Sequence, residues 1–175
     1  MRRPGDRECD PYYTTYIKQV EGDDFLKVLI RAHDNTEKFL SAIEPSRWTF
    51  SYGPDKWTVK ELLLHMIDTE RIFAYRALRI ARSDLTPMAG FDQDDYVPYS
   101  NANERSSTSI VSEYSAVRQA TIQLFKNFTD AMYAKCGTAS ERPFTPLALG
   151  FIIAGHEIHH LRILMEKYQI SNSGY

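Results

Sequence analysis

The chain has 175 residues, of which 43% are hydrophobic and 25% charged, and its formal net charge is −2. This composition is typical of a globular protein, and the nearly balanced charge gives no basic surface of the kind that binds nucleic acid. Cys9 and Cys136 fit neither a disulfide framework nor a zinc finger. No apolar run would span a membrane, and the N-terminus lacks a secretory signal. We expect one cytoplasmic domain over residues 1–175, with residues 1–20 as an N-terminal extension, binding neither nucleic acid nor membrane.

The first two predicted helices are marked by apolar residues that recur near the helical period. The first covers residues 23–43 and ends before Pro45. The second covers residues 58–82. At its start, Thr58 and Glu61 have the spacing of a capping box, in which each side chain accepts a hydrogen bond from the other residue's backbone N–H. This start is therefore sharply defined.

Two further helices are predicted in the second half of the chain. The third covers residues 107–135 and stops at Gly137, because glycine commonly follows the last helical turn. The fourth covers residues 146–168, with Thr145 as its N-cap and Pro146 in its first turn. We therefore expect four long antiparallel helices.

The longest segment without a helical pattern is residues 83–105, and it carries two prolines, a glycine and several acids and amides. A connection this long in a compact domain is usually functional or disordered. No stretch alternates at period two, and the Asn-Gly signals of a hairpin are missing. The predicted fold class is all-α, a four-helix bundle with one long connection between helices two and three.

Three histidines stand in strongly apolar helical surroundings. His156 and His160 are four residues apart, so both side chains lie on one face and can reach the same metal ion. His65 follows "ELLL" in the second helix, and His159 is rotated away from the pair. Burying three imidazoles without partners is costly, and a shared metal would satisfy all three. A polar stripe, or core histidines bonded to backbone carbonyls, remains the simpler alternative.

The stretch "HEIHH" also matches the H-E-x-x-H pattern of zinc proteases, in which Glu157 would activate water. Several features disfavour that alternative. Ile163 and Glu166 stand where the extended motif has glycine and histidine, and only fifteen residues follow His160. No strand is evident before the helix. We therefore interpret Glu157 as a structural polar contact. Asp68 lies one turn after His65, so it could face the same site or orient an imidazole, but a solvated acid on the helix face is the simpler interpretation.

The chain resembles the DinB superfamily, in particular its bacillithiol-transferase-like four-helix bundles. The segments that carry the resemblance are "KWTVKELLLHMIDTE", "RSSTSIVSEYSAVRQATIQLF" and "HEIHHLRIL". Many members have a Gly-Gln pair after the last histidines, where this chain has Arg162 and Ile163. The resemblance implies that His65, His156 and His160 bind a divalent metal, zinc or nickel first and manganese or iron next.

The same resemblance implies a function and an assembly. Characterised members use the metal to activate a low-molecular-weight thiol, so a thiol transferase or a hydrolase acting on a small molecule is expected, in bacterial stress or detoxification metabolism. Family members commonly form homodimers. A non-catalytic bundle that the metal only stabilises stays open as an alternative. We also expect residues 83–105 to lie over or beside the metal site, since long ordered loops in small domains tend to be functional.

Overall fold

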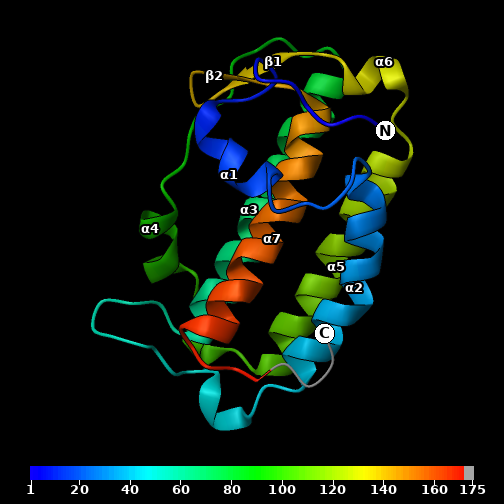
Figure 1. Cartoon of the computed structure of the whole chain (residues 1–175). Helices are drawn as coiled ribbons and strands as arrows, with labels where there is room; N and C mark the ends of the chain where they lie inside the picture. The colour runs from blue at the N-terminus through cyan, green and yellow to red at the C-terminus, as the bar shows by residue number, and fades with distance from the viewer. Residues whose placement is uncertain (172–175) are drawn as a thin grey trace.

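The computed structural model describes residues 1–171, and within them four long helices form a bundle. The helices are α2 (Phe25–Ser41), α3 (Val59–Ala81), α5 (Ser107–Lys126) and α7 (Pro146–Glu166). Helix α3 packs against α5 and α7, and α2 packs against the same two helices, as Figure 1 shows. The predicted all-α four-helix bundle, with its long connection between the second and third long helices, is confirmed.

The capping residues that the sequence singled out define the helix starts. The Thr58 backbone N–H donates to Glu61 Oε2 at 2.7 Å, and the Glu61 N–H donates to Thr58 Oγ1 at 3.2 Å. Thr145 accepts from the Ala148 N–H at 3.1 Å. Three of the four predicted helices therefore have observed bounds within two residues of those expected.

The directions of the helices differ from the expected antiparallel order. Figure 1 shows that α3 and α5 run the same way along the bundle, whereas α2 and α7 run the opposite way. The connection over residues 82–106 explains this, because it is long enough to return along a helix of about 30 Å before α5 begins. It contains α4 (Gln93–Tyr96) and the short 3₁₀ helices Val97–Tyr99 and Ala102–Glu104.

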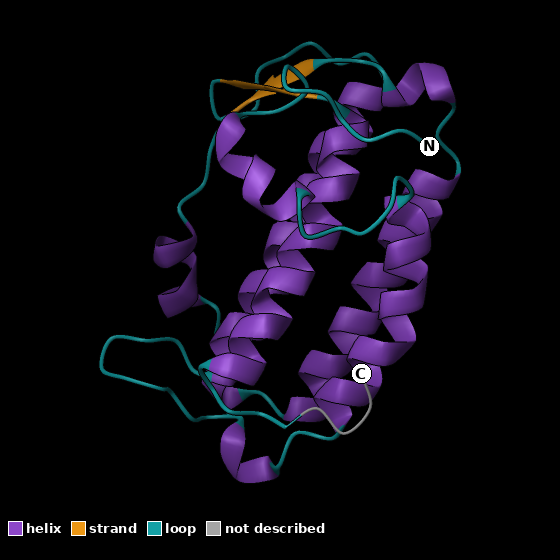
Figure 2. Ribbon diagram, in the orientation of Figure 1, coloured by secondary structure: helices purple, strands orange, loops and turns teal. Residues whose placement is uncertain are grey.

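The prediction of a third helix as far as residue 135 was wrong. Helix α5 ends at Lys126, and Thr129 caps the separate α6 (Asp130–Tyr133) by accepting from Met132 N at 3.3 Å. The strands β1 (Gly137–Ala139) and β2 (Arg142–Phe144) follow as an antiparallel hairpin, shown in Figure 2. They were not predicted either.

The hairpin turn explains why its strands were missed. Its two central residues, Ser140 and Glu141, both have positive φ, 49° and 61°. A two-residue turn of this kind is usually built with Asn-Gly, because glycine and asparagine tolerate that conformation best. The turn therefore exists without its usual sequence signal.

Residues 1–20 lie on the bundle and contact α7. They include the 3₁₀ helix Pro11–Tyr13 and α1 (Thr14–Ile17), and α1 packs directly against α7. Gly155 makes this close approach possible, since a Cβ atom there would lie 1.9 Å from the Tyr16 carbonyl oxygen. The ring of Tyr16 is thereby held 5.3 Å from that of His156.

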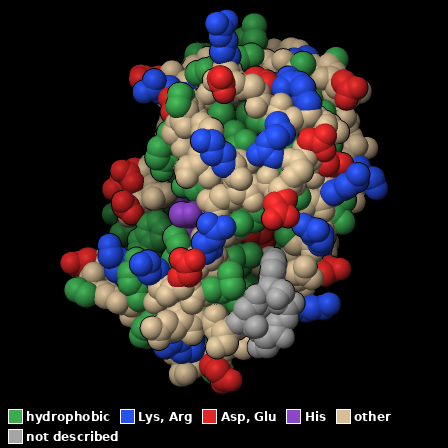
Figure 3. Space-filling model, viewed as in Figure 1, with side chains coloured by type: hydrophobic (Ala, Val, Ile, Leu, Met, Phe, Trp, Pro, Cys, Tyr) green, Lys and Arg blue, Asp and Glu red, His purple; other side chains and the backbone are tan. Residues whose placement is uncertain are grey.

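Helix α7 is the central element of the core. Every residue from Pro146 to Glu157 is buried, as expected for a helix that is apolar on all sides. None of the helices in the described part of the chain is long and apolar enough to cross a membrane. The face drawn in Figure 3 carries acidic and basic side chains interspersed, rather than a field of one sign.

Candidate metal centre

Three buried histidines from two neighbouring helices converge in the core. Helix α3 supplies His65, and α7 supplies His156 and His160 from one face. Because α3 and α7 pack side by side, the imidazoles meet between them. The structure thus brings together the three histidines that the sequence singled out.

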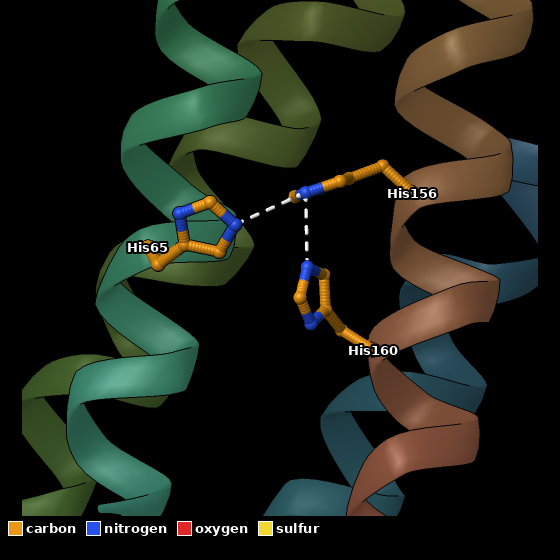
Figure 4. Close-up of side chains that lie close together, drawn as sticks. All are labelled: His65, His156 and His160. Atoms are coloured by element: carbon orange, nitrogen blue, oxygen red, sulfur yellow. Dashed lines mark hydrogen bonds between the residues drawn. The ribbon is translucent and has the colours of Figure 1, made fainter. Parts of the chain in front are cut away.

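The ring nitrogens point toward one another, as Figure 4 shows. The Nε2 atom of His156 lies 3.1 Å from that of His65 and 3.0 Å from that of His160. One ligand atom from each of the three residues falls within 4.8 Å of the others. No other His, Cys, Asp or Glu of the described residues joins this cluster.

These separations suit a divalent metal. With metal–nitrogen bonds of about 2.0–2.1 Å, two nitrogens lie about 2.9 Å apart at a right angle and about 3.3 Å apart at a tetrahedral angle. Both close Nε2–Nε2 distances, 3.0 and 3.1 Å, lie inside that interval. The donor set therefore fits a single metal ion.

Burial keeps the three imidazoles neutral. It lowers the pKa of His65 to about 4 and holds the pKa values of His156 and His160 well below the usual value, with a further lowering from the neighbouring histidines. Neutral imidazole is the form that offers a lone pair to a metal. The three side chains are thus in the binding-competent state at pH 7.

The Nδ1 atoms of His65 and His160 differ in their contacts. His65 Nδ1 lies 3.4 Å from Thr69 Oγ1, and the Trp57 ring packs against the His65 ring at a centroid distance of 4.9 Å. These contacts orient His65 with Nε2 toward the centre. By contrast, His160 Nδ1 is buried with no hydrogen-bond partner among the described residues.

Two neighbouring polar residues lie outside the cluster. His159 is half-buried, and its ring contacts Tyr16 at a centroid distance of 5.4 Å. Asp68 is partly exposed and pairs with Arg71 at 3.4 Å. The placement of His159 agrees with the sequence interpretation, which left it out of the site. Asp68 is less solvated than expected, because burial raises its pKa and it lines a small crevice together with His65.

Glu157 is buried and faces away from the histidines. Its Oε1 accepts a hydrogen bond from the Tyr114 hydroxyl at 2.6 Å, and its Oε2 pairs with Arg118 Nη1 at 2.6 Å. With both oxygens engaged by α5, the carboxylate is not placed to activate water at the histidine cluster. It forms the structural polar contact that we expected.

Sequence reasoning missed the rest of this buried network. Arg118 also binds Glu70 with two hydrogen bonds of 2.9 and 2.7 Å, so one guanidinium joins α3, α5 and α7. A signal was available, because Tyr114 and Arg118 occupy the inward-facing series Ile110, Tyr114, Arg118, Thr121 and Phe125 of α5. A charge at such a position requires partners.

A cavity of about 310 Å³ leads to the histidines from the N-terminal side. Tyrosine and phenylalanine residues from residues 1–20, from α3 and from the long connection make up half of its lining, and polar residues make up the other half. The lining residues are Tyr12, Tyr13, Tyr16, Thr69, Phe73, Phe91, Asp92, Gln93, Asp94 and His156. His156 thus joins the histidine cluster to a space of small-molecule size.

The long connection lies beside the cluster, as predicted. Phe91 and Gln93 line the cavity together with His156, and Tyr96 and Ser100 line a small crevice together with His65. A larger cavity of about 630 Å³ lies between α2 and α5, but none of the three histidines lines it. The space near α1 and α4 is therefore the one relevant to the site.

Comparison with solved structures finds proteins of the same fold, among them two from Bacillus subtilis. YfiT of Bacillus subtilis, described as a probable metal-dependent hydrolase with an unusual four-helix bundle topology, superposes with a TM-score of 0.69 at 15% identity, covering 97% of this chain and 94% of that one. The DinB-like protein YjoA of Bacillus subtilis gives 0.60 at 15% identity, covering 83% and 90%.

Sequence comparison identifies the family. A search of curated protein sequences found no match. The model of the DinB superfamily, however, matches residues 29–164, which include all four long helices almost completely and all three clustered histidines. The chain belongs to the DinB superfamily.

Proposed function

We propose that this chain is a metal-dependent enzyme that acts on a small molecule, with one divalent ion bound by His65, His156 and His160. The observation that carries the proposal is the convergence of three buried, neutral imidazoles, one of which, His156, also lines a cavity of about 310 Å³. The description of YfiT as a probable metal-dependent hydrolase gives independent support.

The proposed metal supplies Lewis acidity, which lowers the pKa of a bound water or thiol. Three protein ligands, without a fourth, suit a catalytic rather than a structural site. We propose zinc or nickel first and manganese or iron next. A site of three imidazoles selects only weakly among these metals.

In this proposal, residues that line the cavity contact the substrate and orient one of the histidines. The rings of Tyr13, Tyr16 and Phe73 offer the substrate an aromatic surface to pack against, in a cavity whose other lining residues are mostly polar. The Tyr16 phenol is protonated at pH 7, as tyrosine ordinarily is, and burial raises its pKa further, so it can donate a hydrogen bond to the substrate. Thr69 holds His65 in orientation.

We propose two reactions at this site, hydrolysis of a small ester or amide and transfer of a low-molecular-weight thiol to a small electrophile. Thiol transfer is proposed because the family resemblance implies activation of a low-molecular-weight thiol. The hydrolase agrees with the description of YfiT. Hydrolysis consumes water, whereas the transfer consumes a thiol. A screen with and without added thiol therefore separates the two reactions.

A zinc protease is a weaker candidate. Its base would have to be Glu157, whose two oxygens are already bound to Tyr114 and Arg118. The two short strands before α7 do not amount to the sheet that such an enzyme would need at its site.

The test is activity of the purified chain on small esters, amides and electrophiles, each with and without bacillithiol, mycothiol or glutathione. We expect a turnover that a chelator abolishes, that added divalent metal restores, that His156→Ala eliminates and that Glu157→Gln largely retains. Peptidase activity lost in Glu157→Gln would contradict the proposal. Full metal occupancy without any turnover would favour the non-catalytic bundle.

A further inference from the structure

Arg76 of α3 is a buried arginine without an acidic partner. Its side chain is only 2% exposed, and no carboxylate of the described residues forms an ion pair with it. Nη2 donates to the Ala89 carbonyl at 2.9 Å and to Ser140 Oγ at 3.0 Å. Nη1 is buried and makes no hydrogen bond with the described residues.

The other deeply buried arginine of this chain shows what is missing. Arg118 is 1% exposed and lies between the two carboxylates of Glu70 and Glu157. A buried guanidinium needs such compensation, because removing an unpaired charge from water costs several kcal/mol. Arg76 has neutral partners only, so its positive charge is left uncompensated inside the protein.

The guanidinium of Arg76 lies directly behind the wall of the cavity that ends at His156. It packs over the rings of Phe73 and Phe91, at 5.6 and 5.7 Å from their centroids, and both rings line that cavity. The Tyr13 phenol, another lining group, interacts with the guanidinium both electrostatically and through a side-chain hydrogen bond. Thr69, Phe73 and Arg76 follow one face of α3, which leads from the histidines along the cavity.

Two acidic residues that line the cavity would repel an anion, in opposition to Arg76. Asp92 and Asp94 line the cavity, but both are exposed, and Asp92 accepts a hydrogen bond from the Asp94 N–H at 2.9 Å. Charges in contact with water are strongly screened, whereas a buried charge is screened much less. Asp92 and Asp94 therefore offset the charge of Arg76 less than buried carboxylates at the same distance would.

We propose that Arg76 is an anion-binding residue, which binds the carboxylate of a ligand whose apolar part fills the tyrosine-lined cavity. One free guanidinium nitrogen and a neighbouring phenol suit a singly charged carboxylate better than a phosphate dianion, which needs more donors. Arg76 itself does not line the cavity, so the proposal includes a shift of the half-buried Phe91 or Tyr13 side chain that gives the carboxylate access to Nη1. This inference rests on the proposed function, because it defines the substrate class of the same cavity.

Three probes with one carbon skeleton test the proposal: 3-phenylpropionate, its neutral amide and the cationic 3-phenylpropylamine. Binding is measured by calorimetry on the purified full chain at pH 7, with metal content determined in each sample. We expect the carboxylate to bind at least about tenfold more tightly than the amide, as charge-assisted hydrogen bonds do, and the amine to bind most weakly.

Two matched variants of α3 assign the effect to the residue. Arg76→Met should remove the preference for the carboxylate without changing the metal content, whereas Arg79→Met, which loses an arginine already paired with Asp84, should keep it. A purely structural role of Arg76 would lower stability and weaken all three probes equally. If Arg76→Met does not fold, Arg76→Lys keeps the charge and should retain a reduced preference for the carboxylate.

The outcomes separate this inference from the proposed function. Equal binding of carboxylate and amide by the unaltered chain would overturn the inference, and so would a preference that survives in Arg76→Met. If the preference survives in Arg76→Met but disappears in His65→Ala together with the metal, the carboxylate binds the metal ion. The inference would then be wrong and the proposed metal site would stand.

Discussion

At the scale of single residues, the side chains of the H-E-x-x-H segment of α7 contact two different groups of residues. His156 and His160 turn toward His65, and Glu157 turns toward Arg118. The histidines could be predicted, since their spacing and apolar surroundings are visible in one segment. The partners of Glu157 could not, because Arg118 and Tyr114 come from another helix, and only the packing of α5 on the bundle brings them there. The role of Arg76 could not be predicted either, because its partners Ala89 and Ser140 come from other segments of the chain.

Glu157→Gln should lower stability and leave the metal bound. We expect the free energy of unfolding to fall by about 1–3 kcal/mol, less than for a lone buried ion pair, because Arg118 keeps both hydrogen bonds to Glu70. Urea unfolding and elemental analysis measure the two quantities. Glu113→Gln is the control, since this half-buried carboxylate pairs with Arg71 and Arg105 near the surface and its loss should lower stability by about 1 kcal/mol or less. A variant with unchanged stability and no metal would place Glu157 in the metal site.

At the scale of elements, helix starts were more predictable than helix ends. Thr58 and Thr145 cap α3 and α7 through their own side chains, so a few neighbouring residues determine where these helices begin. The end of α5 depends on Thr129, a polar residue inside an apparently helical stretch that instead caps α6. The hairpin turn at Ser140 and Glu141 is imposed by packing, with Met88 bonded to its strand.

Gly155→Ala should destabilise the protein, although alanine is the better helix former by about 1 kcal/mol. The added Cβ would lie 1.9 Å from the Tyr16 carbonyl oxygen, which belongs to backbone and cannot move without displacing α1. We expect a clear loss of thermal stability and weaker ligand binding in the cavity that Tyr16 lines. Gly53→Ala, where the nearest atom is 3.6 Å away, should be nearly neutral. Equal melting temperatures for the two variants would contradict the role given to Gly155.

At the scale of the whole molecule, the long connection is what builds the site. By returning along the bundle it lets α5 run parallel to α3, and it brings Phe91 and Tyr96 beside the histidines. Its length predicted a functional loop. Its path could not be predicted, because it depends on contacts such as the hydrogen bond from Arg76 to the Ala89 carbonyl.

The homodimer implied by the family resemblance remains a prediction about the assembled molecule. One chain has a mass of 20.2 kDa, so a dimer has twice this mass, about 40 kDa. Size-exclusion chromatography with light scattering should give the larger value at micromolar concentration. A mass near that of one chain would show that this member is a monomer.

The central claim is that one metal ion joins α3 to α7 through three histidines, and metal content tests it most directly. Elemental analysis of the purified chain should find about one divalent ion per chain. His65→Ala, His156→Ala and His160→Ala should each retain less than about a tenth of it, because two imidazoles make a weak site. His159→Ala and Glu157→Gln should retain most of it, since neither side chain belongs to the cluster. Full occupancy in His65→Ala, or none in the unaltered chain supplied with zinc or nickel, would contradict the account.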